Sequence, residues 1–206
     1  MRKLEPDFYL QTDVTQIARQ LLGKVLHTWL QGQHCAGRIV ETEAYAGATD
    51  RASHAYGQRR TARTEVMYAA GGTAYVYLCY GIHHLFNVVT HQAGTPHAVL
   101  IRAIEPLLGQ DTMSRRRGMV ATDVRLGRGP GSVAQALGIH TAHSGYSLLG
   151  HDIWIADDGH IYPDNAILAT PRIGVDYAGD DALLPYRFIV KNSPSISGTK
   201  RQNSHA

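Results

Sequence analysis

Two glutamates stand two positions apart within residues 38–45, a segment whose β-branched, aromatic and charged residues favour a β-strand. Because side chains alternate along a strand, one face would carry Ile39, Glu41, Glu43 and Tyr45. The other face, with Thr42 and Ala44, is small enough for the strand to be internal. An ionised carboxylate in such a strand is costly unless it is paired or used in chemistry. These residues alone leave open an edge strand on which both glutamates face water.

The twelve histidines and two cysteines form no recognisable metal-binding pattern. Four histidines lie between residues 83 and 97, but no HExxH motif, carboxylate at ligand spacing or cysteine pair completes a site. The zinc-deaminase signature, His-x-Glu followed by Pro-Cys-x-x-Cys, is also absent. Cys35 and Cys79 lie too far apart in sequence to suggest a disulfide framework. We therefore expect no metal and no other cofactor, and keep a zinc hydrolase or deaminase as an alternative hypothesis.

Residues 73–81 give the strongest strand signal in the chain, because tyrosines alternate with aliphatic residues there. A second apolar strand follows at residues 85–90, so we predict a β-hairpin with Tyr80 at or beside its tip. An aromatic side chain at a tip often packs back on its own strand. The alternative is a wedge that enters another molecule, as apolar side chains do between base steps in the minor groove of DNA.

Arginine is unevenly distributed although the net charge is only +3. One group comprises Arg51, Arg59, Arg60 and Arg63, and the other comprises Arg115, Arg116, Arg117, Arg125 and Arg128. Two such groups near aromatic strands favour a polyanion such as nucleic acid, although two solvated loops would look the same. The glycine-rich residues 127–132 precede a helix and could offer N–H groups to a phosphate, but they lack the spacing and the lysine of a Walker motif.

The remaining pattern predicts the elements that position these residues. Asp13 and Gln16 fit a capping box at the start of an amphipathic helix that ends before Gly23. Residues 24–30 and 34–45 form a predicted hairpin, and residues 46–63 a long loop. Further helices are predicted at 64–70, 108–117 and 133–137, and further strands at 97–104, 150–156, 166–175 and 183–190. The polar composition from residue 193 to residue 206 predicts a flexible tail.

Length and composition bound the architecture. With 206 residues, of which 44% are hydrophobic, the chain can fill one core, so we expect a single domain over residues 1–206. The apolar runs are shorter than a membrane span, and the N-terminal residues lack the apolar stretch of a signal peptide. We therefore expect a cytoplasmic protein without a membrane partner.

Several uncommon strings, in the order in which they occur, resemble the alkyladenine (3-methyladenine) DNA glycosylase family in its bacterial form. They are RIVETEAY at 38–45, Ser53-His54, YVYLCYG at 75–81, Asn87, LIRAIEP at 100–106, GPGSVAQAL at 129–137, RIGV at 172–175 and RFIV at 187–190. The resemblance covers nearly the whole chain. It implies a mixed α+β domain with a curved antiparallel sheet, surrounding helices and a protruding β-hairpin.

The resemblance also implies a function, that of a monofunctional DNA glycosylase in base excision repair. Such an enzyme binds double-stranded DNA through the minor groove, flips a damaged purine into a pocket and hydrolyses its N-glycosidic bond. The implied substrate is 3-methyladenine, with 7-methylguanine, hypoxanthine and ethenoadenine as further candidates. One small domain on a duplex needs no second subunit, so we expect a monomer.

Individual roles follow from the same resemblance. In catalysis, Glu43 matches the carboxylate that activates water, and Arg102 and the carbonyl of Val190 match the groups that help to hold it. In the base pocket, Tyr45, His54 and Tyr77 match the walls that stack on the flipped base, and Asn87 matches the residue that discriminates against the amino group of guanine. At the DNA, Tyr80 matches the side chain that fills the hole in the base stack, Met67 matches a residue that touches the opposite strand, and Arg59 and Arg63 are candidates for phosphate contacts.

The proposed chemistry is also plausible on the residues themselves. Glu43 could both stabilise the positive charge that builds on the sugar and deprotonate the incoming water. Tyr45 and Tyr77 would favour a cationic base by about 0.5 to 2 kcal/mol. No lysine lies near these residues in sequence, which predicts hydrolysis without a Schiff base. A non-catalytic DNA-damage-binding module and a formyltransferase-like small-molecule enzyme are the alternatives.

Overall fold

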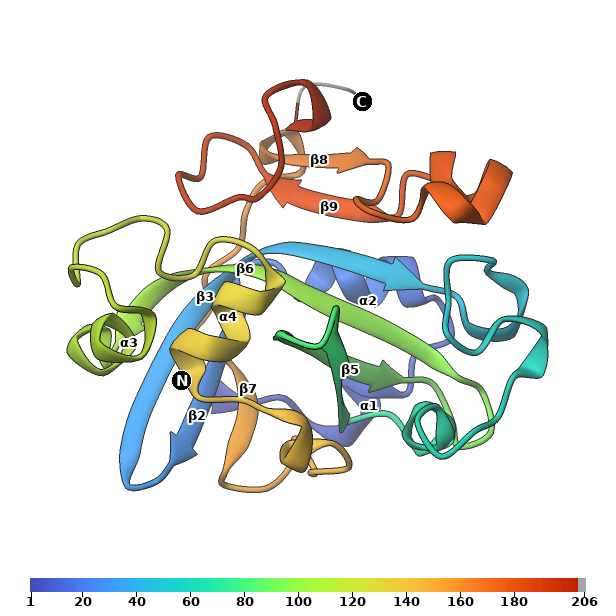
Figure 1. Ribbon diagram of the computed structural model, residues 1–206, viewed down its shortest axis with the longest axis horizontal. Coiled ribbons are helices and arrows are strands. Elements are labelled where there is room, and N and C mark those ends of the chain that lie inside the picture. The colour runs from blue at the N-terminus through green and yellow to red at the C-terminus, as the bar shows by residue number, and fades with distance from the viewer. Residues whose placement is uncertain (204–206) are drawn as a thin grey trace.

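A curved antiparallel sheet of nine strands organises residues 1–203, the part of the chain that the computed structural model describes (Figure 1). Its strand order is β1-β7-β2-β3-β6-β5-β4, and β9 also pairs with β3 and carries β8. The strands are β1 (Arg2–Lys3), β2 (Val25–Leu30), β3 (Gln33–Tyr45), β4 (Thr73–Cys79), β5 (His83–Thr90), β6 (His97–Leu108), β7 (Ile153–Asp157), β8 (Ile167–Thr170) and β9 (Arg187–Val190). The predicted mixed α+β class is confirmed.

In the described residues, four α-helices and several short 3₁₀ segments surround the sheet. The helices are α1 (Pro6–Tyr9), α2 (Val14–Gln20), α3 (Gln110–Arg117) and α4 (Pro130–Leu137), and the 3₁₀ segments are Gly47–Thr49, Tyr56–Gln58, Glu65–Tyr68, Thr141–His143, Asp164–Ala166, Asp176–Leu183 and Arg201–Asn203. Figure 1 shows α4 in front of the sheet and α2 behind it. Within residues 1–203 no helix is long and apolar enough to cross a membrane.

The sequence places most of these elements correctly and misjudges several ends. Asp13 caps α2 as predicted, because its Oδ1 accepts the N–H groups of Thr15 and Gln16 at 2.8 and 3.2 Å. Helix α4 begins at Pro130, earlier than predicted, since proline is well suited to the first turn of a helix. Strand β6 extends beyond residue 104 to Leu108, whereas β8 and β9 are shorter than predicted.

Strand β3 is the centre of the fold. Its first half pairs with β2, and its second half lies between β6 and β9. Both Glu41 and Glu43 are 0% exposed, which excludes an edge strand with wet carboxylates. On the opposite face, the Thr42 hydroxyl donates to the carbonyl of Ala18 in α2 at 2.8 Å. The predicted alternation therefore holds at the end of the strand.

Two bulges interrupt the pairing of β3 with β6 beside the glutamates. Val40 on β3 and Arg102 on β6 each lack a partner across the ladder. The alternation predicted from Ile39 is therefore broken at Val40, and Ile39 packs in the main hydrophobic core. A bulge re-aims side chains and is common next to active sites. The one at Arg102 lies where this side chain meets both glutamates.

The predicted hairpin is formed by β4 and β5, with Tyr80 at its tip. Tyr80 and Gly81 have φ angles of 51° and 74°, and the Ile82 N–H donates to the Cys79 carbonyl at 3.1 Å. Positive φ at both central residues is the requirement of a type I′ turn. The Tyr80 side chain is 89% exposed and Ile82 is 71% exposed. The tip therefore presents two apolar side chains that do not pack back on the hairpin.

The chain after β9 packs against the centre of the sheet. Ser193 and Ser195 are buried, and the Ser197 N–H donates to Glu41 at 2.6 Å. Arg187 in β9 donates to the carbonyls of Ser197 and Gln202. Buried charges thus bind this segment to the sheet, and the expectation of a flexible tail stays a prediction for residues 193–203. The last part of that expectation, residues 204–206, lies outside the described residues.

Candidate active site

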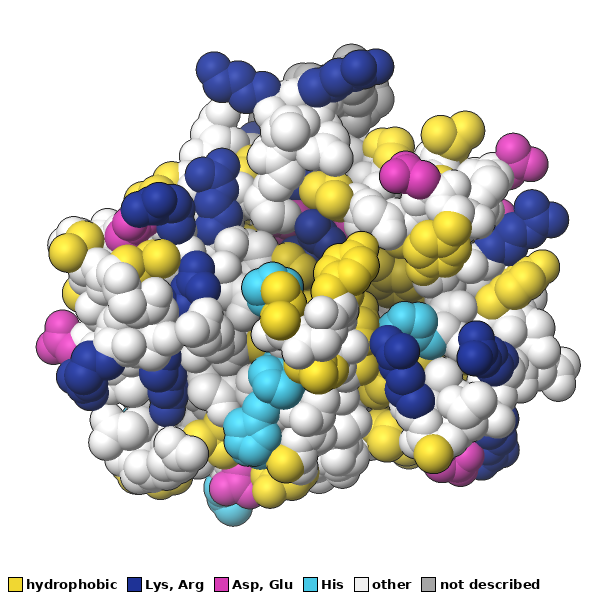
Figure 2. All heavy atoms as spheres, viewed as in Figure 1, with side chains coloured by type: hydrophobic (Ala, Val, Ile, Leu, Met, Phe, Trp, Pro, Cys, Tyr) yellow, Lys and Arg dark blue, Asp and Glu magenta, His cyan; other side chains and the backbone are white. Residues whose placement is uncertain are grey.

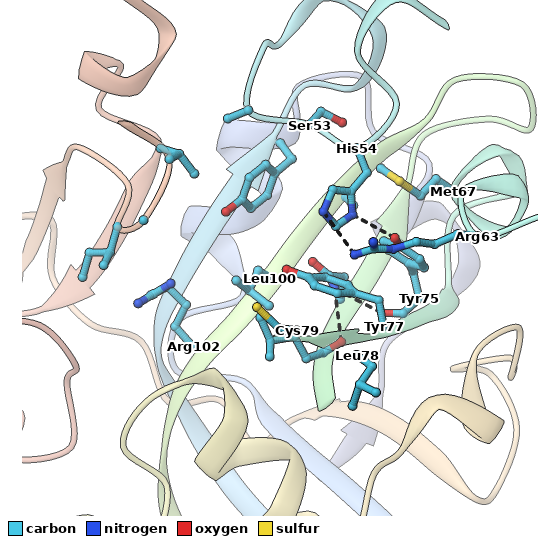
Figure 3. A pocket seen from close by; sticks show the side chains of 18 of the residues that line it. Ser53, His54, Arg63, Met67, Tyr75, Tyr77, Leu78, Cys79, Leu100 and Arg102 are labelled. Carbon is cyan, nitrogen blue, oxygen red and sulfur yellow. Dashed lines mark hydrogen bonds between the residues drawn. The ribbon is translucent and has the colours of Figure 1, made fainter. Parts of the chain in front are cut away.

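A cavity of about 360 Å³ opens between the β4–β5 hairpin, the end of β3 and two loops (Figure 3). Eight of the residues named in advance line it: Tyr45, His54, Arg63, Met67, Tyr77, Tyr80, Asn87 and Arg102. Figure 3 shows Arg102 on the side of the cavity opposite Arg63 and Met67. In Figure 2, Lys and Arg side chains lie on both sides of a central hollow that contains hydrophobic and histidine side chains. Most of the residues that the sequence assigned to one site therefore lie around one cavity.

Glu43 is buried and is not itself among the lining residues, but three residues that line the cavity donate hydrogen bonds to it. Its Oε2 accepts the Tyr45 hydroxyl at 2.8 Å and Nη1 of Arg102 at 3.1 Å. Its Oε1 accepts the backbone N–H of Ile173 at 2.8 Å. The arginine and the backbone amide can only donate, which matches an ionised, acceptor-only carboxylate. These three donors together determine the orientation of the Glu43 carboxylate.

The partners of Glu43 are themselves fixed in their protonation states. Burial raises the pKa of the Tyr45 hydroxyl well above its ordinary value, and the charge of Glu43 adds to this effect. Burial alone would lower the pKa of Arg102, but the charges of Glu43 and Glu41 outweigh it and raise this pKa above its usual value. Tyr45 therefore remains a hydrogen-bond donor and Arg102 a cation at neutral pH.

Tyr45 is held from behind by a second buried ion pair. Arg172 is bonded to Asp50 by two hydrogen bonds of 2.5 and 2.8 Å, and its guanidinium lies 4.9 Å from the centroid of the Tyr45 ring. Arg172 also donates to the carbonyl of Ala44 at 2.9 Å. Because Ile173 follows Arg172 directly, this pair places the N–H that binds Glu43.

An aromatic wall faces the glutamate side of the cavity. The rings of His54 and Tyr77 meet edge to face with centroids 4.6 Å apart, and Nδ1 of His54 lies 2.9 Å from the Tyr75 hydroxyl. Arg63 covers the Tyr77 ring at 4.9 Å and approaches Nε2 of His54 at 3.5 Å. Burial, with the charges of Arg63 and Arg59, lowers the pKa of His54 to about 4. His54 is therefore neutral at physiological pH.

Asn87 is a buried polar residue in the lining of the cavity. It is 4% exposed, and its Nδ2 donates to the carbonyl of Tyr75 at 3.1 Å and more weakly to that of Leu85. Because both amide hydrogens are directed to backbone carbonyls, the orientation of the side chain is determined.

Comparison with known proteins agrees with this geometry. A model of the methylpurine-DNA glycosylase family (MPG) matches residues 7–194. A protein of Chlamydia felis is 45% identical over 196 residues, which are 94% of this chain and 100% of the relative. A protein of Bacillus cereus is 44% identical over 201 residues, covering 93% and 97%, and one of Desulfitobacterium hafniense is 40% identical over 204 residues, covering 96% and 99%. The names of all three contain the words 3-methyladenine DNA glycosylase.

The chain belongs to the methylpurine-DNA glycosylase family. It is therefore a DNA N-glycosylase, an enzyme of DNA repair that acts on DNA. The resemblance found in the sequence is confirmed. The alternative hypotheses of a non-catalytic module, a formyltransferase-like enzyme and a zinc hydrolase or deaminase are superseded.

Three residues named in advance for this glycosylase, Glu43, Arg59 and Val190, are not in the cavity lining. Val190 is not part of the cavity: it packs in the main core, and its carbonyl accepts the Ser193 N–H at 3.3 Å. Glu43 pairs with Arg187, which places Val190 three residues further along β9, and the contact of its carbonyl with the water stays a prediction. The backbone that does reach Glu43 is that of Ile173.

Met67 is part of the cavity lining. It is 2% exposed and packs with Ala55 and Tyr75 in a small hydrophobic cluster, and its contact with the opposite DNA strand stays a prediction. Ile82, next to Tyr80 at the hairpin tip, is an apolar residue that is exposed. Arg59 is exposed but does not line the cavity, whereas Arg63 is part of its wall.

Several residues of the site escaped the sequence analysis. Tyr75 had a signal, since it lies two residues from Tyr77 and so on the same face. Ile173 acts through its backbone, which no side-chain pattern reveals. Tyr177 lines the cavity mouth and donates to the Ala52 carbonyl at 3.1 Å, although it lies far from the other members in sequence. Among residues 1–203, no group of three or more His, Cys, Asp or Glu residues could hold a metal ion.

Proposed function

We propose that this enzyme removes alkylated or deaminated purines from double-stranded DNA by direct hydrolysis, with Glu43 activating the water. The observation that carries the proposal is the position of Glu43. It is a fully buried carboxylate whose donors, Tyr45, Arg102 and Ile173, all line a cavity large enough for one base.

The cavity walls support a flipped purine as the substrate. Tyr45 lies on the glutamate side, and Tyr77 and His54 form the opposite wall. A purine between these rings gains stacking, and a cationic base gains about 0.5 to 2 kcal/mol more from the electron-rich tyrosines. This favours 3-methyladenine and 7-methylguanine. Hypoxanthine and ethenoadenine leave as neutral bases and need a proton, so their release should be slower.

Cleavage builds positive charge on the sugar, and a fixed carboxylate stabilises this charge without reorganisation. The same carboxylate accepts a proton from the attacking water. Arg102 orients Glu43 and can help to hold that water. The main chain of Ile173, which borders both the cavity and Glu43, replaces Val190 as the candidate for the third contact.

The direct mechanism needs no amine nucleophile. No lysine is among the residues that line the cavity within residues 1–203. A Schiff base would require an amine at the sugar carbon, so the enzyme should be monofunctional. Borohydride trapping should give no covalent protein–DNA complex, and a trapped complex would overturn this part of the proposal.

The hairpin supports approach from the minor groove. Tyr80 is positioned to fill the space that a flipped base leaves, with Ile82 beside it against the stack. Arg59 and Arg63 flank the cavity and can contact phosphates, and a monomer suffices for one such site.

The decisive experiment is single-turnover release of base from duplexes that carry 3-methyladenine or hypoxanthine. The unmodified protein should release 3-methyladenine faster. Glu43→Gln should lower the rate by about 10³-fold or more, because charge stabilisation and proton transfer are both lost, while damaged duplex still binds. Glu65→Gln, a change at an exposed glutamate paired with Arg60, is the matched control and should leave the rate unchanged. Equal release by Glu43→Gln and the unmodified protein would refute the role of Glu43.

A further inference from the structure

We infer that Glu41 and Ser197 are positioning residues, which hold the Arg102 guanidinium against Glu43 and couple the segment after β9 to base release. The inference builds on the proposed function of Glu43. It assigns a role to a buried carboxylate and a distant serine that touch neither the cavity nor the reacting atoms.

Glu41 is a second buried carboxylate on the same face of β3 as Glu43. Its Oε1 accepts Nε of Arg102, Nε of Arg187 and the hydroxyl of Ser197, each at 2.8 Å, and its Oε2 accepts the Ser197 N–H at 2.6 Å. Burial raises the pKa of Glu41, but the charges of Arg102 and Arg187 outweigh burial and hold this pKa below its ordinary value. With four donors around an ionised carboxylate, Glu41 has little capacity left for water or substrate.

Arg102 is the link between the two glutamates. Its Nε binds Glu41, its Nη1 binds Glu43 at 3.1 Å, and its Nη2 donates to the Ser197 hydroxyl at 3.1 Å. Each of its three nitrogens therefore has a different partner. Because the guanidinium is planar, two contacts on the far side determine where Nη1 points. An error of about 1 Å at such a group can cost about 10²-fold in rate.

Ser197 completes this arrangement from a distant part of the sequence. Its hydroxyl accepts from Arg102 and donates to Glu41, so both of its hydrogen-bonding roles serve the same network. Its carbonyl accepts Nη2 of Arg187 at 3.0 Å. The segment after β9 is thus fastened to the arginine that touches the catalytic carboxylate.

The chain offers a matched control in Ser195. It is 2% exposed, lies in the same segment, and its hydroxyl donates to the carbonyl of Val124 at 3.3 Å, away from Arg102. Ser195→Ala and Ser197→Ala each remove one buried hydroxyl, so a purely structural role predicts similar effects. Ser197→Thr keeps the hydroxyl and serves as the rescue variant.

The test measures single-turnover release of 3-methyladenine at saturating enzyme, the Kd for duplex DNA and the Tm for each variant. Ser197→Ala should lower the rate about tenfold with unchanged Kd. Ser195→Ala should lower the Tm to a similar extent with a rate within about twofold of the unmodified protein. Ser197→Thr should recover most of the rate.

Activity of the unmodified protein in the same assay separates this inference from the proposed function. With that activity present, equal rates for Ser197→Ala and Ser195→Ala would overturn the inference and leave Glu43 in place. A second readout is independent of turnover: the Arg102 Nε–H signal in nitrogen-15 NMR should exchange faster in Ser197→Ala. An unchanged exchange rate would also overturn the inference.

Discussion

Glu41 and Glu43 lie two residues apart on one face of one strand, and both are 0% exposed. Neither glutamate is itself in the cavity lining, and Glu41 is surrounded by two arginines and Ser197. Glu43 shares only Arg102 with it, and its other donors are the neutral Tyr45 hydroxyl and a backbone N–H at the cavity. Residue type and burial are the same for both, so the partners decide the role.

The difference extends to the regions around each glutamate. Behind β3, buried charges join β9 and the segment after it to the sheet. In front, aromatic rings and neutral polar groups leave room for a ligand. Substitutions should therefore change stability most at Glu41 and change activity more than stability towards the hairpin tip.

The largest expected effect is on folding stability at the two glutamates. Glu41→Gln leaves Arg102 and Arg187 buried without their shared carboxylate and should lower the free energy of unfolding by about 3 to 5 kcal/mol. Glu43→Gln keeps Arg102 paired with Glu41 and should cost about 1 kcal/mol. Urea denaturation of both variants at pH 7 measures the difference. Equal losses would remove the distinction between the two regions.

The residues around these glutamates show what a sequence can predict of the fold. The strand, the hairpin and the N-cap at Asp13 follow from local alternation and turn chemistry, which the sequence carries directly. The bulges at Val40 and Arg102 depend on how β3 and β6 pair, which is a property of two distant segments. The packing of residues 193–203 depends in the same way on distant residues, because buried Glu41 and Arg187 bind the N–H and the carbonyl of Ser197.

The candidate site can likewise be predicted from the sequence only in part. Tyr45, His54, Tyr77 and Asn87 came from the family resemblance, and all four line one cavity. The carbonyl of Val190 was predicted to hold the water, but side-chain patterns do not identify which backbone groups lie at a site. The backbone group that donates to Glu43 is the Ile173 N–H. That contact depends on the ion pair between Asp50 and Arg172, whose members are 122 residues apart.

The second prediction tests the neutral character of the cavity wall. Burial and two arginines lower the pKa of His54 from the unfolded value of 6.5 to about 4. Between these pH values the unfolded chain binds a proton that the folded protein does not, so stability falls as the pH falls. The unmodified protein should lose about 2 kcal/mol more than His54→Gln between pH 7 and pH 4.5. Urea denaturation across this range measures the difference.

The comparison between variants cancels the groups that titrate in both proteins, including the carboxylates and the other histidines. Identical pH dependence of the two proteins would show that His54 is as easily protonated when folded as when unfolded. The aromatic wall would then carry charge, and the contrast with the network behind β3 would be weaker.

The third prediction concerns Tyr80, which packs against almost nothing in the free protein. Because its side chain is 89% exposed, Tyr80→Ala should leave the Tm unchanged. It should lower the yield of released base under trace-enzyme conditions by about tenfold, since the flipped state loses the group that fills the stack. Ile161→Ala, at a 79% exposed side chain between β7 and β8, is the control and should change neither quantity. Unchanged yield for Tyr80→Ala would contradict the wedge.

The smallest effect is expected at the rim, where two neighbouring arginines differ only in their partners. Arg60 forms an ion pair with the exposed Glu65 at 2.7 Å. Arg59 is close enough to the cavity for its charge to lower the pKa of His54. A phosphate contact by Arg59 releases about one counterion, so Arg59→Ala should reduce the slope of log K against log salt by about one. Arg60→Ala should change the slope less, because Glu65 already offsets its charge. Equal slopes for the two variants would place the DNA backbone away from this loop and confine recognition to the hairpin and the cavity.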